Sequence, residues 1–207
     1  MGTFGLIWNN MKPITCVFFG RSGSGKGTQA ELLIKKLKEV DASTKTVYVE
    51  TGDRFRKFVN DSGTYTAARV KEVMGAGGLM PAFVPIWTWT SLLIDELTGG
   101  EHLVFDGVSR RPDEAPILDS ALQFYAREKP VILFLDVPVP EVTERLMKRG
   151  RHDDKEEKIA ERLRWFETDV MKAVHYFETN PYYKFVNIDG DQAIGDVHKD
   201  ILKALGI

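Results

Sequence analysis

Residues 14–26 read ITCVFFGRSGSGK, in which an apolar run passes directly into a loop of glycine and serine that ends in lysine. The run at 14–20 has the composition of a buried strand, and apolar residues at helical spacing follow over 28–40. The loop at 20–26 fits the pattern G-x-x-x-x-G-K, whose glycines let backbone N–H groups curl around a phosphate at a helix N-terminus. In this context the segment predicts a phosphate-binding loop, with Lys26 as the cation for the terminal phosphates.

Four more apolar runs extend this beginning into a sheet. The five expected strands are 14–20, 46–50, 102–107, 131–137 and 183–189. Helical patterns lie between them, including an apolar stripe from Ile159 to Phe177. Strands that alternate with helices predict a doubly wound α/β fold with a parallel sheet, in which ligands bind beyond the carboxyl ends of the strands. The long segment 51–83 is expected to form helices that lie outside that sheet.

Composition restricts the partners of the protein. The 207 residues carry 28 Lys and Arg against 30 Asp and Glu, a formal net charge of -2 that favours neither nucleic acid nor a membrane surface as a partner. The single cysteine, Cys16, excludes an intramolecular disulfide and fits a reducing compartment. No apolar run approaches a membrane span, so we expect a cytoplasmic protein, with residues 1–10 as an N-terminal extension.

The phosphate loop departs from the general pattern in one way that concerns the metal. The position after Lys26 usually holds Ser or Thr, whereas here Gly27 follows and Thr28 comes next. A Mg²⁺ ion would then rely on nucleotide oxygens and water, with Asp106 at the end of the strand 102–107 bound through water.

A second charged stretch, RLMKRGRHDD at 145–154, places Arg145, Arg149 and Arg151 within seven positions. Arginines near a helix end are often ordinary partners of the helix dipole. Residues four apart on a helix share a face, however, so Arg145 and Arg149 repel one another unless an anion lies beside them. Together with the phosphate loop the stretch predicts a phosphate clamp, with Asp153 and Asp154 as ion partners of the arginines.

Five ordered motifs carry a family resemblance. GRSGSGKGTQA resembles the opening of adenylate kinases and related nucleoside monophosphate kinases, and TGDRFR (51–56), GGLMP (77–81) and DGVSR (106–110) resemble later motifs of that family. RLMKRGRHDD, with ERL at 161–163, resembles the lid of short-lid members. The resemblance implies a P-loop NTPase-type fold with a five-stranded parallel sheet, and reversible phosphoryl transfer from Mg-ATP to a nucleoside monophosphate.

The resemblance also divides the chain. It implies core segments at 11–50, 84–148 and 155–207, an acceptor-binding insertion at 51–83 and a minimal lid at 149–154. No Cys and His set could hold zinc in so short a lid, and we expect a monomer that binds only small-molecule nucleotides.

Matched by position, the motifs imply roles for individual residues. The donor would be held by Gly23, Ser24, Gly25, Lys26, Gly27, Thr28, Arg145, Arg149 and Gly190. The acceptor would be held by Thr51, Arg56, Gly78, Leu79, Met80, Gly107, Val108, Ser109, Arg110, Glu114, Arg151 and Arg162. The catalytic set would be Lys26, Arg110, Arg149, Arg151 and Arg162, because phosphoryl transfer is accelerated mainly by positioning and by neutralising phosphate oxygens.

The acceptor base is the open question. Adenylate kinases usually carry a glutamine where this chain has Glu114, and an ionised carboxylate accepts hydrogen bonds but cannot donate one to a ring nitrogen of adenine. Such a carboxylate suits the two neighbouring donors of guanine better. Thr51, in contrast, resembles AMP-selective members. We favour AMP and keep GMP, UMP and CMP open.

Two other classes compete with this interpretation. The chain could be a P-loop kinase of a non-nucleotide metabolite, against which TGDRFR and the clustered arginines argue. It could also be a nucleotide-binding module without turnover, against which the complete set of lysine and arginine positions argues.

Overall fold

The computed structural model describes residues 11–151 and 154–207. The expected N-terminal extension at 1–10 and lid positions 152 and 153, including Asp153, lie outside the described residues.

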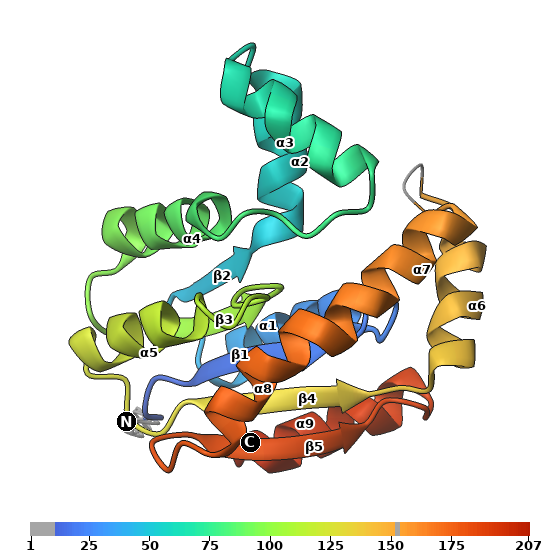
Figure 1. The fold of residues 1–207 in the computed structure, drawn as a ribbon. Coiled ribbons are helices and arrows are strands. Elements are labelled where there is room, and N and C mark those ends of the chain that lie inside the picture. The colour runs from blue at the N-terminus through green and yellow to red at the C-terminus, as the bar shows by residue number, and fades with distance from the viewer. Residues whose placement is uncertain (1–10, 152–153) are drawn as a thin grey trace, which may run out of the picture.

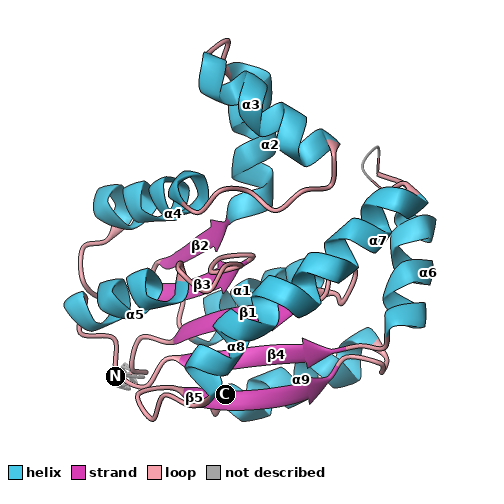
Figure 2. Ribbon diagram, in the orientation of Figure 1, coloured by secondary structure: helices cyan, strands magenta, loops and turns pink. Residues whose placement is uncertain are grey.

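A five-stranded, all-parallel sheet forms the centre of the protein (Figure 2). Its strands are β1 (Thr15–Gly20), β2 (Thr46–Glu50), β3 (His102–Asp106), β4 (Val131–Asp136) and β5 (Lys184–Asp189). Their order is β2-β3-β1-β4-β5, so β1 is central, and every one of its residues is buried. The α/β P-loop fold predicted from the sequence is confirmed, with each strand within a residue of its expected bounds.

Helices cover both faces of the sheet (Figure 1). They are α1 (Lys26–Val40), α2 (Thr51–Asp61), α3 (Tyr65–Gly75), α4 (Phe83–Glu96), α5 (Ala115–Phe124), α6 (Val139–Arg149), α7 (Glu156–Trp165), α8 (Met171–Glu178) and α9 (Ile194–Leu205). None of those described is long and apolar enough to cross a membrane.

The side chains of β1 alternate between two apolar clusters. Val17 and Phe19 pack into one cluster with α4, α5 and α8, whereas Cys16 and Phe18 pack into the other with α1 and α9. Because both faces of the strand are buried, its sequence is a continuous apolar run.

The phosphate loop follows β1 at the carboxyl edge of the sheet. Gly23 has φ +86°, and a Cβ there would lie 2.8 Å from the carbonyl oxygen of Val142, so only glycine fits this turn. Gly25 is left-handed as well, and α1 begins directly after it at Lys26, two residues before the expected start.

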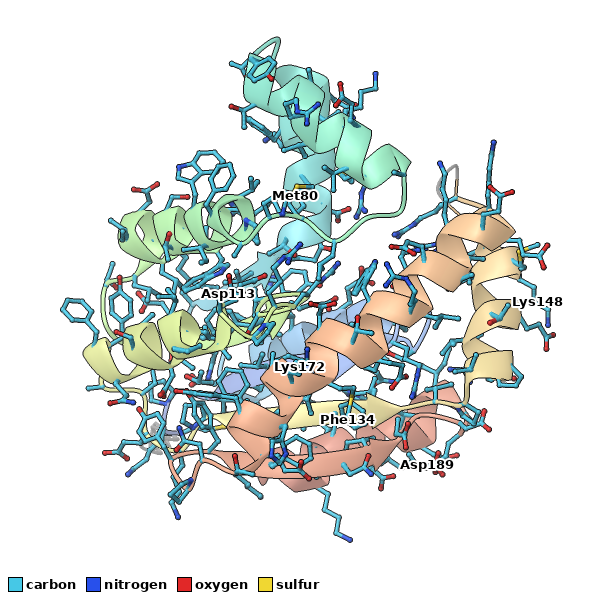
Figure 3. The ribbon with its side chains drawn as sticks, viewed as in Figure 1. Met80, Asp113, Phe134, Lys148, Lys172 and Asp189 are labelled. Atoms are coloured by element: carbon cyan, nitrogen blue, oxygen red, sulfur yellow. The ribbon has the colours of Figure 1, made fainter. Side chains whose placement is uncertain are left out.

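The segment after β2 forms two helices that stand above the sheet edge (Figure 1). The carboxylate of Glu50 caps α2 by accepting hydrogen bonds from the backbone N–H groups of Gly52 and Asp53. The helices share a small apolar cluster of their own, in which Met80, labelled in Figure 3, packs with Phe55 and Val70.

The apolar stripe from Ile159 to Phe177 is helical throughout, but it is not a single α-helix. A π-helical segment, η1 (Phe166–Val170), lies between α7 and α8. Both of its end residues are buried in the core, and its wider turn changes the helical phase between Trp165 and the residues of α8.

Candidate active site

A cavity of about 770 Å³ opens at the carboxyl edge of the sheet, within the size range of ligand sites. Most residues that the sequence predicted for the site line it. They are Gly23, Ser24, Gly25, Lys26, Gly27, Thr28, Thr51, Arg56, Gly78, Leu79, Met80, Asp106, Gly107, Arg110, Glu114, Arg145, Arg149, Arg151, Arg162 and Gly190. Val108 and Ser109 do not line the cavity and are buried behind it, with Ser109 at φ +53°.

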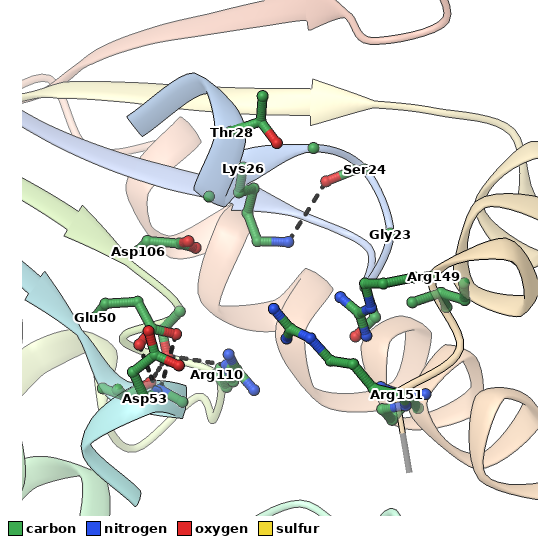
Figure 4. A pocket seen from close by; sticks show the side chains of 18 of the residues that line it. Gly23, Ser24, Lys26, Thr28, Glu50, Asp53, Asp106, Arg110, Arg149 and Arg151 are labelled. Carbon is green, nitrogen blue, oxygen red and sulfur yellow. Dashed lines mark hydrogen bonds between the residues drawn. The ribbon is translucent and has the colours of Figure 1, made fainter. Parts of the chain in front are cut away.

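Lys26 lies folded over its own loop. Its ammonium group donates to the carbonyl oxygens of Gly20 (2.8 Å) and Arg21 (2.9 Å). Burial lowers the pKa of Lys26 to about 8; Asp106 opposes this shift, and the positive charges of Arg110 and Arg149 add to it. Figure 4 shows Lys26, Arg110 and Arg149 converging from three different segments. A phosphate placed among them would favour the charged lysine.

Asp106 is buried at the end of β3, beside the start of α1. A Cβ on Gly27 would lie 3.6 Å from Asp106 Oδ2, and the hydroxyl of Tyr48 is 3.5 Å from the same oxygen. Among the described residues no group of three acidic, His or Cys side chains is gathered that could hold a metal alone. One carboxylate next to a phosphate loop fits Mg²⁺ that takes most of its ligands from nucleotide oxygens and water.

Arg149 and Arg162 are held by Asp154, whose side chain is fully buried. Arg149 donates to both carboxylate oxygens (2.8 Å each), and Arg162 donates to one (2.7 Å). Burial of the carboxyl opposes ionisation, but these two guanidinium groups hold the pKa of Asp154 at about 2. The predicted ion pairing of Asp154 is therefore confirmed, while the side chain of Arg151 is exposed at the cavity rim.

Arg145 connects α6 to the segment after β5. Its Nε donates to Glu141 (2.7 Å), and its Nη1 donates to the carbonyl oxygen of Gly190 (3.2 Å). Arg145 and Gly190, both predicted to hold the donor, thus lie in contact in the cavity wall.

On the opposite side, Arg56 and Arg110 face the cavity from α2 and from the loop after β3. Arg56 pairs with Asp53, and Arg110 donates to the carbonyl oxygen of Gly107 (2.9 Å). The hydroxyl of Thr51 donates to the same carbonyl (2.7 Å) and so ties α2 to that loop.

Two residues that the sequence analysis missed hold the loop at 77–80. Arg111 donates to the carbonyl oxygens of Met80 (2.7 Å) and Leu79 (3.0 Å), and Trp165 Nε1 donates to the carbonyl of Gly77 (3.0 Å). Arg111 directly follows the motif DGVSR, and its position there was a usable signal. Trp165 carried no such signal in the sequence, because a tryptophan in an apolar helical stripe is expected to be a core residue.

Glu114 is the least expected group in the cavity wall. It is 1% exposed, and neither of its carboxylate oxygens has a partner at full hydrogen-bond geometry in the described part of the chain, although the backbone N–H of Arg110 lies near enough to favour the ionised form. Burial raises the pKa of Glu114 to about 7, against the opposing charge of Arg110.

The phosphate loop, the strand-end carboxylate and the arginines from several segments define a nucleotide-binding P-loop protein. Comparison with known proteins gives the family: the profile described as adenylate kinase matches residues 18–182. The chain belongs to the adenylate kinase family and is a nucleoside monophosphate kinase.

Individual relatives agree in length as well as in sequence. An adenylate kinase of Mycolicibacterium vanbaalenii is 31% identical over 92% of this chain and 98% of its own length. An adenylate kinase of Prochlorococcus marinus is 30% identical over 84% of this chain and 90% of its own. A uridylate kinase of Saccharomyces cerevisiae is 30% identical over 90% of this chain and 87% of its own.

Proposed function

We propose that the protein transfers a phosphoryl group from Mg-ATP to AMP, reversibly, giving two ADP. The observation that carries this proposal is the convergence of Lys26 and several arginines from separate segments on one cavity, at the carboxyl edge of a parallel sheet. Phosphoryl transfer needs such cations on the equatorial oxygens and no protein nucleophile.

The donor would occupy the end of the cavity formed by the phosphate loop, Arg145 and Gly190. Backbone N–H groups of the loop at the start of α1 would bind its phosphates. Mg²⁺, when bound, would neutralise the β- and γ-phosphate oxygens, and Asp106 would hold it through water.

The acceptor would occupy the opposite end, between α2, the loop at 77–80 and Glu114. Arg56 and Arg110 would fix its phosphate by charge-assisted hydrogen bonds. Arg151 and Arg162 would bridge from the donor side to the migrating phosphoryl group. Closure of these groups would exclude water, which is the competing acceptor.

AMP is the proposed acceptor because Thr51 resembles the AMP-selective pattern, and because several relatives of similar length are named adenylate kinases. A relative named uridylate kinase keeps a pyrimidine nucleotide as an alternative. GMP stays an alternative because of the Glu114 carboxylate.

The test is a coupled assay with Mg-ATP and, separately, AMP, GMP, CMP, UMP and dTMP, at about pH 6. We expect the highest kcat/KM with AMP, and its loss in Lys26→Met. Another rank order would overturn the acceptor assignment. Tight nucleotide binding without turnover would instead identify a non-catalytic binding module.

We further propose that the protein acts as a monomer in the cytoplasm, with no nucleic-acid or membrane partner. Its nearly balanced charge supports the part of this proposal that concerns nucleic acid and membranes. A single particle mass of about one chain in light scattering, across a range of protein concentrations, is the expected result.

A further inference from the structure

Glu114 precedes α5 and lines the cavity next to Gly107 and Arg110. The Glu114 carboxyl group is buried, and no side chain of the described residues donates a hydrogen bond to it, so that it has lost its water and keeps hydrogen-bonding capacity to fill. Such a group, placed in the wall of a ligand cavity, points to a ligand that supplies the missing hydrogen bonds.

We propose that Glu114 makes the choice of acceptor base depend on pH. Its neutral form binds adenine, and its ionised form binds guanine. The inference rests on the proposed function, since it places the acceptor base at Glu114.

The hydrogen-bonding patterns of the two forms differ in the required way. A neutral carboxyl group has one O–H donor and one carbonyl acceptor, which is the pattern of a glutamine amide. Its O–H can donate to N1 of adenine while its carbonyl accepts from the 6-amino group. An ionised carboxylate offers only acceptors, which fit the adjacent N1–H and 2-amino donors of guanine. The proton is exchanged with solvent, so adenine binding at high pH takes one up.

The surroundings of Glu114 bring this equilibrium close to neutrality. Burial raises its pKa to about 7, and the nearby charge of Asp113, labelled in Figure 3, acts in the same direction. Arg110, through its charge and its backbone N–H, and Arg111, through its charge, favour the ionised form. A glutamate with an ordinary pKa would be ionised throughout the neutral range.

Charged groups from other elements also face the cavity. They are Glu50 at the end of β2, Asp53 and Arg56 at the start of α2, Lys26 and Glu31 on α1, Asp106 at the end of β3, Arg145 and Arg149 on α6, Arg151 after it, and Arg162 on α7, together with the titratable Tyr48 on β2. The acidic ones favour the neutral form of Glu114 and the basic ones favour the ionised form. None of them forms a hydrogen bond with its carboxyl group.

The size of the effect follows from the titration. With a pKa of about 7, the neutral fraction is about 0.9 at pH 6 and about 0.1 at pH 8. The kcat/KM for AMP should then fall about tenfold over this interval while that for GMP rises about tenfold. The AMP to GMP ratio should change by about 100-fold. Lys26 and the nucleotide phosphates titrate in the same way with either acceptor, so their contributions cancel in the ratio.

The experiment measures kcat/KM for AMP and for GMP at saturating Mg-ATP between about pH 6 and pH 8, for three proteins. Wild type should show the change in ratio. Glu114→Gln fixes the amide pattern and should prefer AMP equally at every pH. Asp113→Asn is the matched control: it removes a neighbouring charge, so the same change should appear at slightly lower pH.

The outcomes separate this inference from the proposed function. If neither AMP nor any other monophosphate is phosphorylated, the proposed function itself is wrong. If AMP is phosphorylated but the wild-type ratio stays constant with pH, only the role of Glu114 is overturned. That role is overturned in the same way if Glu114→Gln keeps the wild-type pH dependence.

A second measurement needs no variant. Calorimetric titration of the wild-type protein with AMP at about pH 8, in two buffers of different ionisation enthalpy, reports the protons taken up on binding. We expect uptake of close to one proton with AMP and of none with GMP. Equal proton exchange for both nucleotides would contradict the proposal.

Discussion

Replacing Asp154 by asparagine tests whether one buried carboxylate holds Arg149 and Arg162 together. A pKa of about 2 in the folded protein, against an ordinary value of 3.8, corresponds to about 2 kcal/mol of stabilisation at neutral pH. The neutral amide would remove the ionised carboxylate that contacts both Arg149 and Arg162, so we expect a loss of about 2 kcal/mol in the free energy of unfolding.

The pH dependence makes the test specific. Because the folded-state pKa of Asp154 lies below its unfolded value, the stabilisation is complete above the unfolded pKa and is lost as pH falls through the folded one. The stability difference between wild type and Asp154→Asn should narrow by about 1 kcal/mol from about pH 6 to about pH 3. At about pH 3 Asp154 is mostly protonated in the unfolded chain but still mostly ionised in the folded protein.

Urea unfolding at both pH values measures this difference. Glu161→Gln is the matched control, because it removes an acid that pairs with Arg164 on the surface of α7. Exposed pairs contribute little, so this variant should stay close to wild type. If Asp154→Asn is as stable as Glu161→Gln, or if its deficit is the same at both pH values, the assigned role of Asp154 is wrong.

Three more predictions concern the same cavity. Arg110→Ala should lower kcat by about 10²-fold or more while changing the free energy of unfolding little. A loss of stability in urea unfolding as large as the loss of activity would contradict a catalytic role. With a Lys26 pKa of about 8, kcat/KM for Mg-ATP should fall above about pH 8 as the ammonium loses its proton; a flat profile would refute this. Trp165→Phe removes the donor to the Gly77 carbonyl at a cost of about 1 kcal/mol. It should raise the acceptor KM more than it lowers kcat, whereas the control Trp87→Phe, at a half-exposed site, should not.

The fold was predictable because parallel strands and phosphate loops leave strong local patterns. β1 and β3 are buried on both faces and therefore appear as unbroken apolar runs. The turn at Gly23 has no space for a Cβ, so the glycine that marks the loop in the sequence is required by the structure. Most residues predicted for the site line one cavity for the same reason, since each motif directly follows a strand or lies at a helix end.

The partners of those residues were not predictable. That Lys26 folds onto its own loop, and that Arg56 pairs with Asp53, depend on rotamers rather than on spacing. Trp165 reaches Gly77 across 88 positions of the chain, and no periodic pattern encodes such a contact. Glu114 was recognised as unusual, but its burial and its unpaired oxygens became apparent only in three dimensions.

The acids that pair with arginines in the cavity wall affect how strongly nucleotide affinity depends on ionic strength. Arg56 is matched by Asp53, Arg145 by Glu141 and Arg149 by Asp154, so each cation already carries a counter-ion supplied by the protein. Binding of nucleotide phosphates would exchange one fixed anion for another rather than release salt anions from a bare cluster. Affinity for nucleotides should therefore weaken less with added salt than the number of arginines suggests. The interaction of Arg149 with Asp154, whose side chain is buried, should be screened least.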